Sequence, residues 1–83
     1  MAEQFNGNNG LSPSGKPGDI GLVQVVSVGS GEVQLEGSIN GGNNWTPIAT
    51  FSEPKIQAVV LTPAMRVTNG SGAAPNAVVW LES

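Results

Sequence analysis

From residue 20 to the end of the chain, hydrophobic residues occur in short runs rich in valine, isoleucine and threonine, separated by glycine, asparagine, serine or proline. Runs of this kind are typical of β-strands, and no stretch has the sustained 3.6-residue hydrophobic period of an amphipathic helix. The pattern predicts an all-β domain of about six strands, at residues 20–28, 32–39, 45–51, 56–61, 64–69 and 76–81. Because the connectors are short, we expect consecutive strands to pair mostly as antiparallel neighbours.

The hydrophobic pattern differs between these strands. Residues 32–39 alternate strictly between apolar and polar positions, which predicts a strand with one solvated face. Its expected inward positions are Val33, Leu35, Gly37 and Ile39. The runs AVVL (58–61) and AVVWL (77–81), in contrast, are apolar on both faces. They favour stacked sheets, in a small antiparallel β-sandwich or flattened barrel, with apolar surface left over for a partner.

The surplus apolar surface predicts a homo-oligomer or another protein partner. Within the two apolar runs, the positions that we expect to contact this partner are Val59, Val79 and Trp80. With 83 residues and no cysteine, the chain has a small core and no disulfide to stabilise it, so association is the expected means of stabilisation.

Residues 1–18 form the other recognisable part of the chain. They are rich in glycine, asparagine and proline and contain few large apolar residues, which predicts a flexible N-terminal arm outside the core. The β-sandwich domain is then expected to span residues 19–83. Phe5 and Leu11 are spaced so that an extended arm could place both on a partner surface, and we expect them to act as anchors there; the alternative is a flexible tail with no attachment role.

Composition excludes several functional classes. Only 11% of the residues are charged, well below the roughly 25% usual in soluble domains, and the three basic residues are scattered, which argues against a nucleic-acid partner. No apolar run is long enough for a membrane-spanning helix, and the N-terminus lacks the features of a signal peptide. We therefore expect a soluble protein that is made in a cytoplasm and does not act at a membrane.

Catalytic and metal-binding residues are equally scarce. Without histidine or cysteine the chain has no Ser-His or Cys-His nucleophile pair and lacks the commonest zinc ligands. Glu32 and Glu36 share one strand face, but a separation of roughly 13 Å is too great for a two-carboxylate mechanism. We expect neither enzymatic activity nor a cofactor or metal ion.

The sequence SINGGNNW (38–45) allows two interpretations. Asparagine and glycine tolerate positive φ, so residues 40–44 suit a hairpin loop, with Trp45 beginning the next strand and packing across the strand pair near Ile39. Alternatively, the loop could bind a ligand, with Trp45 as an aromatic platform. In that case the candidate ligand-binding residues are Asn40, Asn43, Asn44 and Trp45.

Three segments carry a resemblance to known proteins: VQLEGSINGGNNWTPIATF (33–51), AVVLTPAMRVTNGSG (58–72) and AVVWLE (77–82). They resemble the strand-turn-strand pattern of small β-sandwich virion proteins of tailed bacteriophages. The resemblance implies a capsid decoration, or cement, protein that binds the major capsid protein or other virion subunits, and it implies no catalytic residue. Because cement proteins often occupy three-fold positions, a trimer is the first expectation.

The same turn, followed by a strand containing arginine, also resembles discoidin-type domains, which bind carbohydrate and lipid. This chain is roughly half as long as such a domain, and Asn40 stands where that family often has aspartate. The second resemblance implies an alternative function, a glycan- or surface-binding module of a phage tail or fibre.

Overall fold

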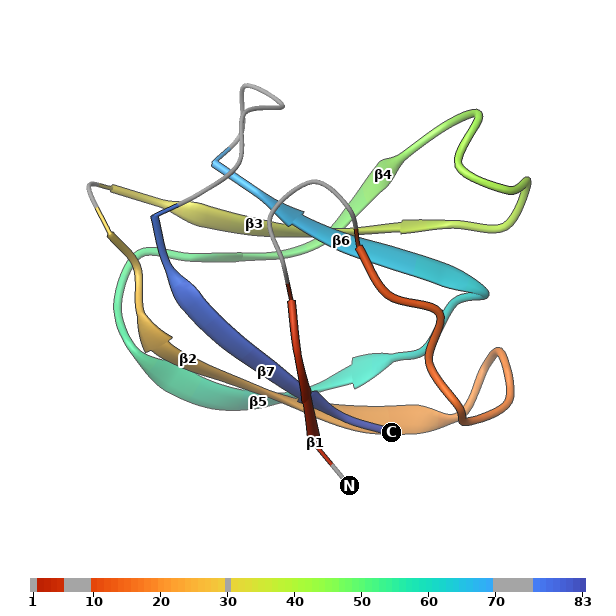
Figure 1. The fold of residues 1–83 in the computed structure, drawn as a ribbon, viewed down its shortest axis with the longest axis horizontal. Helices are drawn as coiled ribbons and strands as arrows, with labels where there is room; N and C mark the ends of the chain where they lie inside the picture. The colour runs from red at the N-terminus through yellow and green to blue at the C-terminus, as the bar shows by residue number, and fades with distance from the viewer. Residues whose placement is uncertain (1, 6–9, 30, 70–75) are drawn as a thin grey trace.

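The computed structural model describes residues 2–5, 10–29, 31–69 and 76–83, and this part of the chain folds as two stacked antiparallel sheets without a helix (Figure 1). The four-stranded sheet has the order β1-β7-β2-β5, and the three-stranded sheet has the order β4-β3-β6. The strands are β1 (Ala2–Gln4), β2 (Ile20–Ser27), β3 (Val33–Ser38), β4 (Thr46–Phe51), β5 (Lys55–Val60), β6 (Ala64–Thr68) and β7 (Val78–Glu82). The predicted all-β sandwich is confirmed, and the expected strands lie within one or two residues of the observed ones, with β1 in addition.

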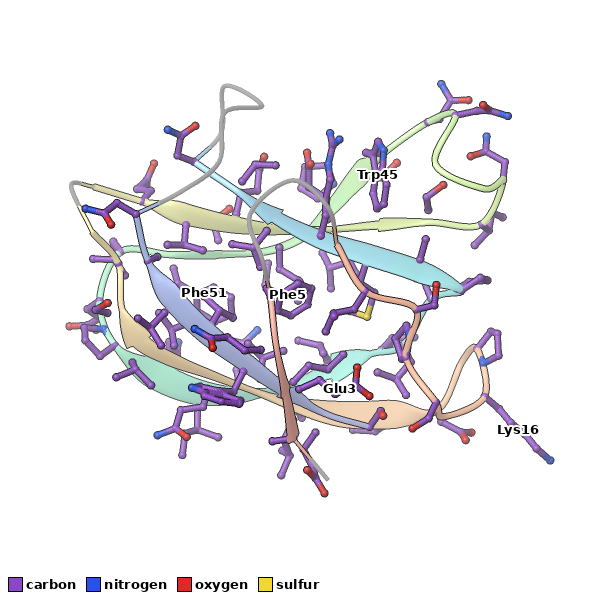
Figure 2. All side chains as sticks on the ribbon, viewed as in Figure 1. Glu3, Phe5, Lys16, Trp45 and Phe51 are labelled. Carbon is purple, nitrogen blue, oxygen red and sulfur yellow. The ribbon has the colours of Figure 1, made fainter. Side chains whose placement is uncertain are left out.

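The core lies between the two sheets, where alternate side chains of each strand meet. On β2, Val23 and Val25 are buried while their neighbours in sequence are exposed, because successive side chains of a strand point to opposite faces. Phe51 closes β4 in the same layer, between the sheets in Figure 2. The buried hydrophobic side chains are Phe5, Val23, Val25, Val33, Leu35, Phe51, Val59, Leu61, Met65, Val67, Val79 and Leu81.

The expected pairing of consecutive strands is wrong for most of the described strands. Only β3 and β4 are both consecutive and paired; β2 pairs with β5 and β7, and β3 also pairs with β6. Most connectors therefore cross from one sheet to the other. A few extended residues can span the roughly 10 Å between stacked sheets, so short connectors are compatible with crossing as well as with hairpins.

The prediction that residues 1–18 lie outside the core is wrong at Phe5. Strand β1 pairs with β7, the backbone N–H of Phe5 donates to the carbonyl of Val79 at 3.0 Å, and the Phe5 ring is buried in the core. Leu11 forms a two-way backbone bridge with Met65, at 2.6 and 2.8 Å, and packs half-buried against the core. Neither side chain is free to anchor on a partner in this structure. Residues 6–9 of the predicted arm and the connector at 70–75 lie outside the described residues.

The physical reason is that the six predicted strands alone leave the core short of apolar volume. A domain of this size buries a smaller fraction of its surface than a larger domain does, so one aromatic side chain is a large part of its core. The hydrogen bonds to β7 offset the ordering of residues that, by composition alone, would stay unfolded.

The position of Phe5 leads to a stability prediction. Replacing it with alanine removes a buried ring from a small core, and we expect Phe5→Ala to lower the free energy of unfolding by about 3–5 kcal/mol. The matched control is Gln4→Ala, which changes the exposed neighbour on β1 and should alter stability by less than about 0.5 kcal/mol. Urea unfolding followed by tryptophan fluorescence measures both, and equal stabilities of the two variants would contradict the role of Phe5 in the core.

Candidate functional site

The outer side of the four-stranded sheet carries an apolar surface. Its largest exposed side chains lie on β2 and β5, and each is at least 48% exposed. Cross-strand register brings them together: Ile20 faces Val60, and Leu22 faces Ala58. Trp80 of β7 and Ile56 of β5 flank Gln24 in the next row. We call this surface the outer apolar face; it consists of Ile20, Leu22, Val26, Ile56, Ala58, Val60 and Trp80.

The sequence prediction located surplus apolar surface on the correct strands but chose the wrong alternate positions on two of them. Val59 and Val79, predicted to contact a partner, are buried in the core of their own chain. Their neighbours Val60 and Trp80 point outward instead, because side-chain direction alternates with every residue. Trp80 is therefore the one residue of the predicted partner-binding set that lies on the outer apolar face, where it is half-buried.

Sequence reasoning missed Ile20, Leu22, Ile56 and Val60 as surface residues. A signal for them exists in β2, whose alternate positions Ile20, Leu22 and Val26 are as apolar as the inward positions Val23 and Val25. Only the packing of the second sheet decides which of the two sets is covered.

A shallow hollow of about 160 Å³ lies on the outer apolar face. It is bordered by Ala2, Leu22, Gln24, Ile56, Trp80 and Glu82.

The loop between β3 and β4 is held by its own polar side chains. The Ser38 hydroxyl donates to Asn40 Oδ1 at 2.8 Å and accepts from the backbone N–H of Gly42 at 3.0 Å. Asn40 in turn accepts from the backbone N–H of Asn44 at 3.0 Å, and its Nδ2 donates to Asn44 Oδ1 at 2.8 Å. Gly41 and Gly42 have φ of 74° and 89°, a backbone conformation that residues other than glycine rarely adopt. The loop is thus a preformed turn.

Trp45 follows this loop and lies on the outer side of the three-stranded sheet (Figure 2). The Arg66 guanidinium stacks over its ring, with Cζ 4.4 Å from the ring centroid, and Arg66 Nε donates to Glu36 Oε1 at 2.7 Å. Glu36 and Arg66 are directly opposite each other on β3 and β6. Trp45 is half-buried in this stack, while Ile39, the expected packing partner of Trp45 and an expected inward residue, is 83% exposed. Both expectations for Ile39 are wrong because β3 ends at Ser38.

A second hollow, of about 360 Å³, opens beside the same loop. It is bordered by Gly37, Ser38, Ile39, Asn40, Asn44, Thr46, Pro47, Ile48 and Thr62. Of the predicted ligand-binding residues, Asn40 and Asn44 border this hollow, whereas Asn43 and Trp45 do not. The structure therefore does not bring the predicted loop residues together around one cavity. The Asn40 side chain is also already engaged within the loop.

The described part of the chain contains few side chains that could bind a metal ion. None of its acidic side chains gather in a group of three or more that could hold a metal ion. Over the same residues, no helix is long and apolar enough to cross a membrane. The chain matches no protein-family model, no curated protein and no solved structure.

The Glu36–Arg66–Trp45 stack yields a second stability prediction. Both charged side chains are mostly buried, with 12% and 23% of their surfaces exposed, so removing one leaves the other partly desolvated without its partner. We expect Arg66→Gln to lower the free energy of unfolding by about 1–2 kcal/mol. In a double-mutant cycle, Glu36→Gln and Arg66→Gln should show a favourable coupling that decreases in 1 M salt. Additive effects of the two substitutions in urea unfolding would contradict a stabilising ion pair.

Proposed function

We propose that this protein is a non-enzymatic structural component of a virion, a capsid decoration (cement) protein that binds and stabilises the head shell of a tailed phage. The observation that carries the proposal is the outer apolar face, which presents several large hydrophobic side chains to solvent on one side of a small domain. Contiguous apolar surfaces of this kind are typical of protein-protein contacts. The resemblance of the strand-turn-strand segments to phage virion proteins directs the proposal towards a shell.

The chemistry of the face supports a protein partner. It lies on β7 and β2 in the interior and on β5 at one edge of a hydrogen-bonded sheet, so the backbone that carries its side chains is ordered before binding. Its aromatic member, Trp80, belongs to the residue types that contribute most to binding energy at interfaces. The low overall charge fits a surface that is desolvated on assembly, because charged residues are depleted in interface cores.

A cement protein stabilises a shell because it binds the assembled shell and does not bind the separate shell subunits. Each bound copy then adds its binding free energy to the assembled state, which raises the temperature at which the shell comes apart. In this proposal the outer apolar face lies against the major capsid protein, and the three-stranded sheet, with Glu36, Arg66 and Trp45, faces the solvent.

The test uses purified head shells of the phage that carries the gene, without bound decoration protein. Wild-type protein should co-sediment with these shells and raise their thermal disassembly temperature, while Leu22→Lys, which places a charge in the face, should weaken binding at least about tenfold. Thr50→Lys, an exposed position on β4 of the other sheet, is the matched control and should bind within about twofold of wild type. Wild-type protein that fails to bind shells would overturn the proposal, and equal loss in both variants would overturn the assignment of the face.

A second candidate function, a glycan-binding module, is favoured by one observation, the hollow of about 360 Å³ beside the preformed loop. If this hollow binds neutral sugars, a panel of neutral oligosaccharides titrated by calorimetry should give measurable binding that Asn44→Ala weakens several-fold. Asn43→Ala, which changes a loop residue outside the hollow, is the control. The cement proposal predicts no binding to this panel.

A further inference from the structure

We infer that β5 is a self-association edge, through which two copies of the chain pair antiparallel and join their four-stranded sheets into one continuous sheet. This inference concerns the free protein and does not rest on the virion role. It starts from a comparison of the edges of the two sheets, because an unprotected edge strand presents a row of unpaired N–H and C=O groups that favour pairing with another chain.

Three of the four edge strands in the described structure carry a feature that limits pairing. Strand β1 has only three residues. Strand β4 contains Pro47, which has no backbone N–H, and an irregularity in its register with β3. Strand β6 is covered at Met65 by the two-way backbone bridge from Leu11.

Strand β5 has none of these features. It has six residues, no proline and an unbroken register with β2, and its single charge, Lys55, stands at its first residue. Among the described strands it pairs with β2 alone. Natural edge strands are commonly protected by charges, prolines or bulges, and the absence of any such feature from residues 56–60 favours an edge that is covered by a partner.

The hydrogen-bond pattern identifies the free backbone groups. The Leu61 N–H donates to the Asp19 carbonyl at 2.8 Å and the Leu61 carbonyl accepts from the Gly18 N–H at 2.9 Å, so both backbone groups of Leu61 point towards the β2 side of β5. Because hydrogen-bonded positions alternate in antiparallel pairs, Val59, Gln57 and Lys55 also bond to β2. The N–H and C=O groups of Ile56, Ala58 and Val60 therefore point to the open edge.

The side chains of these same three residues lie on the outer apolar face and are exposed. A two-fold axis at Ala58 would place Ile56 opposite Val60 of the second copy and Ala58 opposite its own equivalent. Three pairs with two hydrogen bonds each would give about six new bonds, and the β-branched pairs are favourable cross-strand neighbours.

The symmetry of this arrangement favours a second copy over an unrelated strand. The outward positions of this segment are a large residue, Ile56, then Ala58, then a second large residue, Val60, so the order of sizes is the same in both chain directions. The edge is therefore complementary to a second copy of itself, as a two-fold contact requires. Both outer apolar faces would lie on the same side of the joined sheet. The resulting contact is two-fold and predicts a dimer, in place of the trimer expected from the sequence.

The experiment is analytical ultracentrifugation of the full-length chain without any shell, over roughly 1 µM to 1 mM. Wild type should approach twice the 8.4 kDa mass of the chain as concentration rises. Ala58→Lys, which sets two like charges opposite each other on the axis, should raise the dissociation constant at least about tenfold. Because Ala58 is exposed, the variant should keep the wild-type circular dichroism spectrum and, at a concentration where both chains are monomeric, the wild-type melting temperature, which shows that it is folded.

Two further variants make the test specific for the edge. Leu22→Lys adds the same charge to the neighbouring strand in the same row, and it should leave the dimer intact if the sheets join edge to edge. An equal mixture of Ala58→Lys and Ala58→Glu chains should dimerise, because opposite charges then face each other on the axis. A chain that stays monomeric at about 1 mM, a trimer, or a dimer that Leu22→Lys disrupts as strongly as Ala58→Lys would overturn the inference.

Discussion

The packing of two sheets against each other through alternate side chains is the constraint on which the rest of this structure depends. Because each strand has a period of two, the choice of the inward set on β2, β5 and β7 determines the outward set at the same time. Burying Val23, Val59 and Leu81 leaves Leu22, Val60 and Trp80 on the outer surface. The outer apolar face is therefore a direct consequence of core packing on strands that carry apolar residues on both faces.

The N-terminal segment completes the core that the six central strands begin. Phe5 enters between the sheets, while β1 covers the edge of β7 and Leu11 covers the edge of β6. One segment thereby adds apolar volume and protects two edges. Strand β5 lies at the edge of the four-stranded sheet opposite β1, and it is left open where the outer apolar face reaches the boundary of the sheet. The dimer proposal originates in this uneven protection, whereas the shell-binding proposal originates in the outer apolar face.

Two of the few charged side chains stabilise local structure on the opposite side of the molecule. Glu36 and Arg66 pair across β3 and β6, and Arg66 also covers Trp45 at the end of the preformed loop. This arrangement holds the Trp45 ring in place. From the sequence alone, that ring could have served either in packing or in ligand binding. The stack accounts for Trp45 as a packed residue, and the hollow beside the loop lies next to Asn40 and Asn44 instead.

The sequence by itself determined the all-β class, the positions of the six central strands and the loop at 40–44, because strand runs and turn residues are local features. It also indicated surplus apolar surface on the strands around Val60 and Trp80. Tertiary structure alone decided that Phe5 belongs to the core, that β2 pairs with β5 and β7, and that Val59 and Val79 point inward. When both faces of a strand are apolar, local pattern cannot select the buried set, and only contact with the second sheet resolves it.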